Sequence, residues 1–321
     1  LRYPSPQTER LESDPQAKAF IAAHVAPRLA GLTGKAGAID SMGNLIWQLG
    51  GTGAGALLLM GYAMTFPAAS MKQPFSGALV DGQPFGAATR CARGRGACEQ
   101  KGALAAMIYA SAIVARARVA LRAPLVLAVS LAGETGRHDA AQMILKNQAV
   151  SARSAIIGLG TGNRIALGNK GRVDIEITVR GRAAHSSMPE NGVNAVDGFR
   201  RVMERLDRLA LGAGHPDLGR ATLTVTQVRS GPEISHTIPD ICRVVLDRRL
   251  LPGEDADDSF GEIQNALDEV TGWSVEVTRG AFMYPSEVTR DCPLALATAA
   301  AYRALTREEG GWFYSSAALV A

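Results

Sequence analysis

The stretch Lys170–Ala195, KGRVDIEITVRGRAAHSSMPENGVNA, combines a strand signal with a histidine among small residues. Its first half alternates apolar and polar side chains, the period of a strand with one buried face. The apolar positions are Val173, Ile175, Ile177 and Val179. A Gly-Arg turn leads to His185, and Pro189 and Gly192 break the chain before a helix that begins near Asn194. A strand ending in this way can deliver His185 into a cleft, although the histidine can also do no more than cap the turn.

This stretch opens a segment with its own order of elements. The pattern predicts a strand, a helix, two strands, a helix and a strand. They cover residues 173–180, 194–210, 221–228, 241–250, 257–270 and 274–279. The β-α-β-β-α-β order is typical of the ferredoxin-like split unit. We therefore predict that residues 170–280 form a lid inserted into a larger domain, whose free sheet edge pairs with a second copy in a homodimer.

Before residue 170, strands alternate with helices, which indicates an α/β sheet. Apolar runs predict strands at 44–49, 56–60, 124–131 and 154–158. Helices are predicted at 15–31, from about Lys101, and at 137–146. We predict that residues 1–169 and 281–321 form this α/β domain, which resumes with a helix from Pro293.

The composition narrows the class of protein. The chain of 321 residues is 47% hydrophobic and 20% charged, which is ordinary for a globular protein. The net charge of +4 is scattered, and no basic run is interleaved with aromatic residues, so nucleic acid is not an expected partner. The longest apolar run, residues 123–132, is far short of the ~20 residues of a membrane helix. The N-terminus lacks the apolar region of a signal peptide, and the four cysteines show no metal or disulfide spacing. We expect a cytoplasmic protein without a membrane partner.

Two carboxylates are expected at one edge of the α/β sheet. Ligands gather at the carboxyl ends of such strands, where the prediction places residues 61–62, 94–102, 133–134 and 158–162. Glu99 and Glu134 lie in these segments beside glycines, which suits a divalent cation with oxygen ligands. His138 follows Glu134 by four residues at a helix start, so both can project to one side. The alternative for Glu134 and His138 is a capping or surface role without metal contact.

Residues 181–195, GRAAHSSMPENGVNA, also resemble a known motif. They are similar to the lid motif of the dinuclear zinc exopeptidases and amidohydrolases, which include acetylornithine deacetylase, succinyl-diaminopimelate desuccinylase, aminoacylase and carboxypeptidase G. The similarity covers roughly residues 56–253. It implies a mixed-sheet, zinc-exopeptidase-like α/β catalytic domain with an inserted ferredoxin-like lid that dimerises. It also implies that His185 enters the partner's active site and stabilises an oxyanion.

The resemblance assigns substrate contacts to further lid residues. Residues 231–240, GPEISHTIPD, resemble the segment that enters the partner's cleft, with His236 where asparagine is common. In VLDRRLLPGE, Arg249 matches an arginine that clamps a substrate carboxylate, a task that suits its planar fork. Asn194, in the lid motif, is taken as a third substrate contact. The alternative for Arg249 is a surface salt bridge with Asp247 or Glu254.

The metal-binding segments of that family are matched only in part. In GRGACEQKG, Glu99 stands where a bridging aspartate is usual, and in LAGETG the catalytic base position is Gly133, which leaves only Glu134. LLLMGYAMTFP has Tyr62 and Met64 in place of a His-x-Asp pair. Leu159 replaces a later acid in IIGLGTG, and the last metal histidine would lie beyond Ala321. The resemblance therefore implies that the C-terminal part of the catalytic domain, residues 1–169 and 281–321, is incomplete.

Two carboxylates cannot hold two zinc ions, which need about four ligands each. A dinuclear site of the usual kind is therefore not expected. One ion, zinc or manganese, is possible with Glu99, Glu134, His138 and a water, and Glu134 would then activate the water.

Three functions follow from these residues. The first is a metal-dependent hydrolase that cleaves an amide-type C–N bond of a small carboxylate-bearing substrate, such as an N-acyl amino acid, with Glu134 and His185 catalytic. The second is a degenerate homologue that binds or regulates without catalysis. The third is a thiol-dependent hydrolase using Cys98, because a cysteine near a helix start is acidified. The expected role of Cys98 is nevertheless buried packing.

Overall fold

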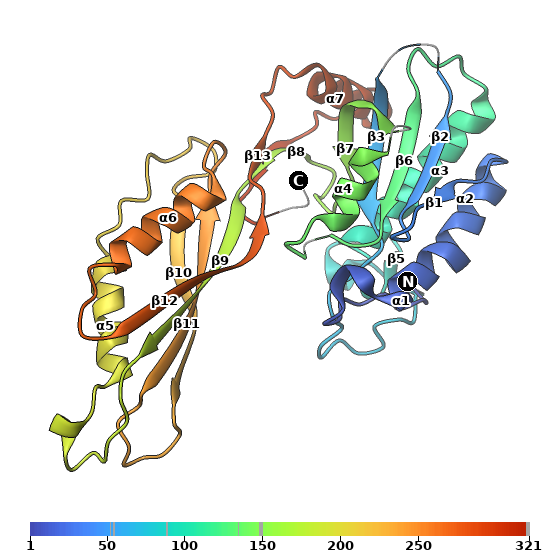
Figure 1. Cartoon of the computed structure of the whole chain (residues 1–321). Helices are drawn as coiled ribbons and strands as arrows, with labels where there is room; N and C mark the ends of the chain where they lie inside the picture. Colours follow the sequence, from blue (N-terminus) through green and yellow to red (C-terminus); the bar gives the residue numbers. More distant parts are fainter. Residues whose placement is uncertain (52, 54, 88, 134, 148–149, 319–321) are drawn as a thin grey trace. The chain divides into compact units, whose positions relative to one another are not determined.

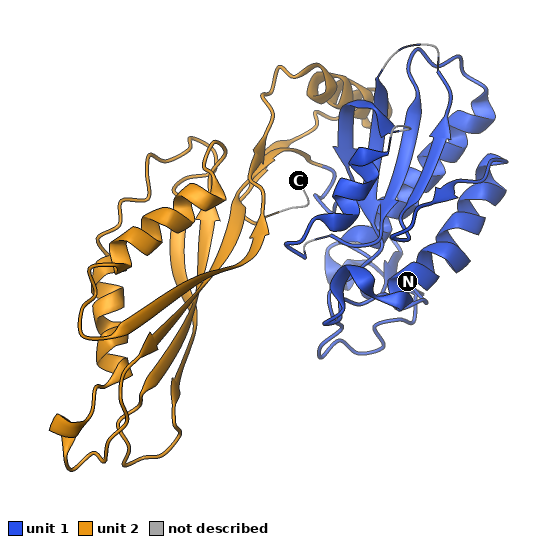
Figure 2. Cartoon of the chain, viewed as in Figure 1, with its two compact units in different colours: residues 1–163 blue, residues 164–321 orange. Residues whose placement is uncertain are grey.

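The computed structural model describes residues 1–51, 53, 55–87, 89–133, 135–147 and 150–318. The chain divides into two compact units, Leu1–Asn163 and Arg164–Ala321 (Figure 2). In the described ranges, no helix combines the length and apolar character that crossing a bilayer requires. All four cysteines are free.

The first unit contains, in its described residues, a five-stranded mixed sheet in the order β1-β2-β6-β3-β7 (Figure 1). Strands β6, β3 and β7 run parallel to one another, whereas β2 is antiparallel to β1 and β6. The strands are β1 (Ala38–Ile39), β2 (Leu45–Leu49), β3 (Ala56–Tyr62), β6 (Leu125–Ser130) and β7 (Ala152–Ile157). A separate hairpin pairs β4 (Ala78–Val80) with β5 (Cys91–Arg93). The parallel trio is the arrangement that α/β proteins bury on both faces.

Helices cover both faces of this sheet. One face packs on α1, α2 and α3, where Ile21, Leu29 and Leu104 meet Trp47 and Leu127. On the other face, side chains that alternate with these, such as Ile46 and Val126, pack against Ile144 of α4. The helices are α1 (Pro15–Phe20), α2 (Ala26–Thr33), α3 (Gln100–Ala117) and α4 (Asp139–Lys146). The alternation of side chains along each strand therefore supplies two cores from one sheet.

The helix expected over residues 15–31 is interrupted. A π-helical segment, Ile21–Val25, separates α1 from α2, and Pro27 lies in the first turn of α2. A proline has no N–H and is tolerated at the first turn of a helix. The predicted inward face is nevertheless correct, because Phe20, Ile21 and Leu29 are buried.

The second unit is built on a four-stranded antiparallel sheet in the order β10-β11-β9-β12 (Figure 1). Its strands and helices are β9 (Gly171–Arg180), α5 (Ala195–Leu206), β10 (Thr222–Gly231), β11 (Ile241–Leu250), α6 (Ala256–Leu267) and β12 (Ser274–Met283). This is the ferredoxin-like arrangement that the sequence predicts. The four alternating apolar residues of β9 are completely buried under α5 and α6.

The rest of the second unit is small. A three-stranded sheet, β13-β8-β14, pairs β8 (Ile165–Asn169) with β13 (Ser286–Glu287) and, in parallel, with β14 (Trp312–Ser315). Helix α7 (Pro293–Thr306) begins at the predicted Pro293. The assignment of 170–280 as an inserted lid stays a prediction. The mixed α/β fold class with a ferredoxin-like domain is confirmed.

Replacing Ile177 by alanine should lower the free energy of unfolding by about 2–5 kcal/mol, because Ile177 is completely buried at the centre of β9. Chemical denaturation measures the change. Glu176→Ala is the control, since Glu176 lies on the exposed face of the same strand, and it should change the stability by no more than about 0.5 kcal/mol. Equal losses in the two variants would contradict the assignment of faces.

Candidate functional site

The rim of the first unit lies where the parallel strands β3, β6 and β7 end. Gly133, after β6, sits over the ring of Tyr62 at the end of β3, where a Cβ would approach the ring to 2.8 Å. Gly160, after β7, lies against the carbonyl oxygen of Cys98, where a Cβ would come within 1.6 Å. Only glycine permits such approaches. The structure therefore brings the segments around residues 62, 98, 133 and 160 together, as the topology predicts.

Tyr62 occupies the centre of this rim. It is 2% exposed, and its hydroxyl accepts a hydrogen bond of 2.8 Å from Nε2 of Gln100, which is itself buried. The amide oxygen of Gln100 has no partner among the described residues. Met64, two residues further on, is also buried. The two positions where the family resemblance expects a His-x-Asp pair thus hold an aromatic ring and a thioether packed out of solvent.

The predicted metal donors are placed in different ways. Glu99 precedes α3, remains about one-third exposed and forms an ion pair with Arg95 at 3.5 Å. His138 directly precedes α4 with a φ of 62° and is half-buried. Glu134 lies outside the described residues. Within the described ranges no three His, Cys, Asp or Glu side chains are grouped to hold a metal ion, so Glu99 and His138 are not joined there by a third described donor.

A residue that the sequence analysis missed holds the loop that leads to α4. Glu12 is 5% exposed, and its two carboxylate oxygens accept hydrogen bonds of 2.8 Å from the hydroxyl of Thr135 and the N–H of Ala140. Glu12 lies more than 120 residues away in the chain. No local pattern around a single glutamate marks it as a positioning residue, because its partners are supplied only by folding.

The prediction that Cys98 is packed in the interior is wrong. Cys98 is exposed in the turn that precedes α3, because its segment runs along the surface of the rim. Its thiol makes no hydrogen bond or ion pair within the described part of the chain. No described base is therefore hydrogen-bonded to the thiol, as the thiol-dependent alternative requires.

In the second unit, the structure brings two predicted site residues together. His185 and His236 lie on adjacent loops, with ring centroids 5.4 Å apart, and the loops are joined by the N–H of Ser186 donating to the carbonyl of His236 at 2.9 Å. Nδ1 of His185 accepts from the N–H of Ser187 at 3.2 Å and lies 2.8 Å from the Ser187 hydroxyl. A ring that accepts at Nδ1 carries its proton on Nε2 when neutral. His185 is exposed and thus offers an Nε2–H donor.

The side chains of the other two predicted lid residues already form hydrogen bonds within the second unit. Arg249 forms two hydrogen bonds with Asp247, at 2.7 and 2.9 Å, the salt bridge given above as its alternative role. A carboxylate oxygen of Asp247 also lies 3.8 Å from Nε of Arg172. The hydrogen bond between Arg172 and Asp174 raises the pKa of the Arg172 guanidinium. The side-chain oxygen of Asn194 caps α5 by accepting from Val196 N–H, which leaves only its amide nitrogen to donate.

An α/β unit with a rim of close-approach glycines and a ferredoxin-like unit with an exposed histidine pair form the arrangement that the family resemblance predicts. Residues 167–274 match the M20 family described as the peptidase dimerisation domain. The resemblance to this family is confirmed: the chain carries an M20 dimerisation domain and has the M20 fold.

Particular relatives agree with this family. The acetylornithine deacetylase of Myxococcus xanthus is 30% identical over 218 residues, which cover 66% of this chain and 54% of the relative. The succinyl-diaminopimelate desuccinylase 2 of Shewanella loihica is 27% identical, over 60% and 52% of the two chains. The M20 family metallo-carboxypeptidase of Sulfolobus solfataricus superposes with a TM-score of 0.78 at 16% identity, covering 99% of this chain and 84% of that one. The chain thus spans about half the length of these curated relatives.

The Tyr62–Gln100 hydrogen bond gives a test of the rim. Tyr62→Phe removes the hydroxyl that Gln100 Nε2 donates to and leaves a buried donor unpaired, at an expected cost of about 1–3 kcal/mol in unfolding free energy. Combining it with Gln100→Leu should restore part of that loss, because both polar partners are then absent. A double-mutant cycle from denaturation measures the coupling. Additivity within ~0.3 kcal/mol would contradict the hydrogen bond.

Lys101, in the first turn of α3, should make the free energy of unfolding depend on pH in the alkaline range. Burial lowers the pKa of its ammonium from 10.5 to about 8, while Nζ donates to the carbonyl of Tyr3 at 2.6 Å. Between pH 8 and 10.5 the unfolded chain holds this proton more tightly than the folded chain, so stability should rise with pH in that window. Relative to Lys101→Met, which does not titrate, the wild type should gain roughly 1–3 kcal/mol between pH 8 and 10. Parallel pH profiles would contradict this expectation.

Proposed function

We propose that this chain belongs to a metal-dependent hydrolase that cleaves an amide-type C–N bond of a small carboxylate-bearing substrate. The observation that carries the proposal is the exposed His185–His236 pair, with Nδ1 of His185 held by Ser187. An exposed Nε2–H can donate a hydrogen bond to an oxyanion. Donors of this kind stabilise the negative charge that develops in the transition state. The M20 resemblance supports the choice of an amide substrate.

The remaining roles are assigned by chemistry. His185 would donate from Nε2 to the tetrahedral oxyanion in the active site of a partner subunit, in a homodimer formed through the second unit. His236 and Asn194 would contact the substrate. Arg249 would bind the substrate carboxylate by exchanging it for Asp247, since both present two oxygens to the guanidinium fork.

A divalent ion, zinc or manganese, would supply Lewis acidity when bound. Glu99, Glu134 and His138 are the proposed donors, and they suit one ion rather than two. Because the described donors do not complete such a site, no step is assigned through the ion. Glu134 is proposed as the base that takes a proton from the attacking water.

A second candidate function is ligand binding without turnover, in a degenerate homologue. The specific observation in its favour is the buried Tyr62 with its hydrogen bond to Gln100, where the resemblance expects metal ligands. The pairing of Arg249 with Asp247 also fits this second function, because the guanidinium is already occupied by a carboxylate of the protein. The two functions make opposite predictions for metal content and turnover.

Elemental analysis of the purified chain, with hydrolysis of N-acetyl amino acids, tests the hydrolase. We expect about one zinc or manganese per chain, loss of activity with a chelator, and recovery when the ion is restored. A chain that holds no metal and whose activity ignores the chelator would end the metal-dependent proposal. A chain that binds these substrates without turnover would favour the degenerate homologue.

His185→Asn tests the oxyanion donor. We expect kcat to fall by roughly 10²–10³ with little change in KM, since the donor acts mainly on the transition state. His236→Asn is the matched control on the adjacent loop, and we expect roughly a tenfold loss or less, because an amide can replace a substrate-contacting imidazole. An equal loss in both variants would contradict the separate roles.

A further inference from the structure

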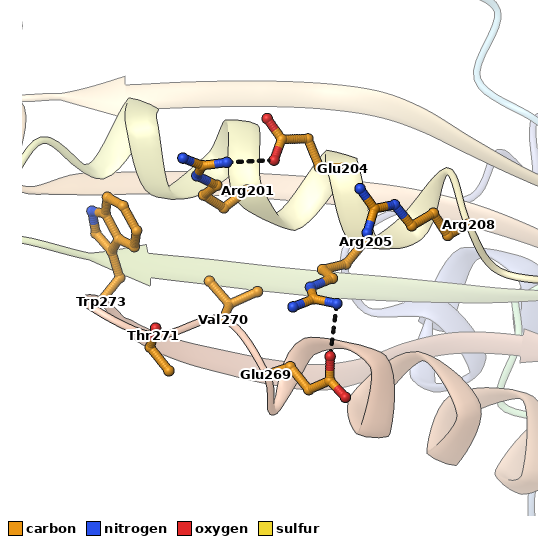
Figure 3. A pocket seen from close by; sticks show the side chains of 8 residues that line it. All are labelled: Arg201, Glu204, Arg205, Arg208, Glu269, Val270, Thr271 and Trp273. Atoms are coloured by element: carbon orange, nitrogen blue, oxygen red, sulfur yellow. Dashed lines mark hydrogen bonds and ion pairs between the residues drawn. The ribbon is translucent and has the colours of Figure 1, made fainter.

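A pocket of about 440 Å³ lies on the helical face of the second unit, outside the residues assigned above (Figure 3). It is bounded by α5 on one side and by the turn between α6 and β12 on the other. Its lining residues are Arg201, Glu204, Arg205, Arg208, Glu269, Val270, Thr271 and Trp273. We call it the α5 pocket. Its volume is within the range of sites that hold small ligands.

One wall of the α5 pocket is held in place. The indole N–H of Trp273 donates to the carbonyl of Asn194 at 2.8 Å. The ring packs over Gly198, where a Cβ would approach ring atoms to 2.7 Å, so any larger residue would displace the indole. Val270 beside it is 9% exposed. This wall is therefore formed before any ligand arrives.

The opposite wall carries three arginines, two on α5 and one in the turn that follows it. Arg201 and Arg205 are four residues apart on α5, the spacing that aligns side chains along a helix, and Arg208 lies just beyond the end of the helix at Leu206. Arg201 donates to Glu204 at 2.8 Å and Arg205 pairs with Glu269 at 2.7 Å. Figure 3 shows both pairs at the pocket.

Arg208 has no such partner. In the described part of the chain, its guanidinium makes no ion pair and no hydrogen bond. The hydrogen bond from Arg201 lowers the pKa of Glu204, and the charges of Arg201, Arg200 and Arg208 add to this effect. Glu204 therefore stays ionised at neutral pH. Three guanidiniums against two carboxylates leave the lining with one surplus positive charge.

We propose that the α5 pocket binds a small multivalent oxyanion, a phosphate or carboxylate compound, with Arg208 as its first contact. The planar guanidinium fork matches two oxygens of either group. Arg205 can join Arg208 by exchanging Glu269, whose side chain is 68% exposed, because an exposed ion pair of this kind contributes little to stability. The site is distinct from the histidine pair and needs no metal.

Calorimetric titration of sodium pyrophosphate into the full chain, at low ionic strength and without divalent ions, tests the proposal. Arg208→Gln should weaken binding by about tenfold, since it removes the free fork. Glu269→Gln should instead tighten binding by about threefold, because it releases Arg205. Arg243→Gln is the control: it makes the same change of charge, but Arg243 is exposed on the open face of β11 and outside the lining, so the affinity should stay within about twofold.

Sodium citrate in the same titrations separates the two sources of oxyanion. The probe that binds more tightly and responds to Arg208→Gln identifies a phosphate or a carboxylate ligand. Failure of both probes to bind at millimolar concentration would overturn the proposal. Equal losses for Arg243→Gln and Arg208→Gln would also overturn it, because they would show diffuse attraction by the positive charge of the chain.

Discussion

Burial of one face of β9 is the constraint on which the second unit depends. This strand lies between β11 and β12, and every second side chain from Val173 to Val179 is completely buried under α5 and α6. A slip by one residue would put Arg172 and Asp174 into that core, a cost that excludes other registers. The register then decides which loop carries His185 and sets Arg249 opposite Arg172 on the neighbouring strand.

The same register produces a conflict of charges that the side chains resolve locally. Arg172 faces Arg249, and Asp174 faces Asp247, so like charges are directly opposite across β9 and β11. Each arginine turns along its own strand to the aspartate two residues away. These contacts organise the open face of the sheet. They also mean that a substrate carboxylate at Arg249 has to compete with a partner that the protein already supplies.

The rim of the first unit depends on close backbone approach at two glycines rather than on strand register. Glycines let the loops after β6 and β7 approach Tyr62 and Cys98 more closely than any side chain would allow. The buried pair Tyr62 and Gln100 occupies this rim, and the described residues include no group of three metal donors. In the proposed function, chemistry at this rim would depend on Glu99, which is paired with Arg95 in the structure, and on the segment that contains Glu134 and His138.

The sequence predicted the main strands and helices of both units because their signals are local, whereas the short strands β1, β4, β5, β8, β13 and β14 were not predicted. Alternation along residues 173–180 and the apolar runs of the α/β sheet each lie within one element, so period and length were enough to place them. The break at Ile21–Val25 was missed because a continuous apolar face does not distinguish α from π geometry. The resemblance in residues 181–195 named the family correctly for the same reason, since a motif is contiguous.

The site was less accessible to sequence reasoning, because its contacts join residues far apart in the chain. The sequence determined that His185 follows a strand and that Glu99 precedes a helix. Only the tertiary structure decided that His185 meets His236, that Glu12 holds Thr135, that Arg249 is paired with Asp247, and that Arg208 faces a pocket without a partner. The physical reason is that hydrogen bonds and ion pairs act over a few ångströms in space, whereas sequence patterns report only the faces of single elements.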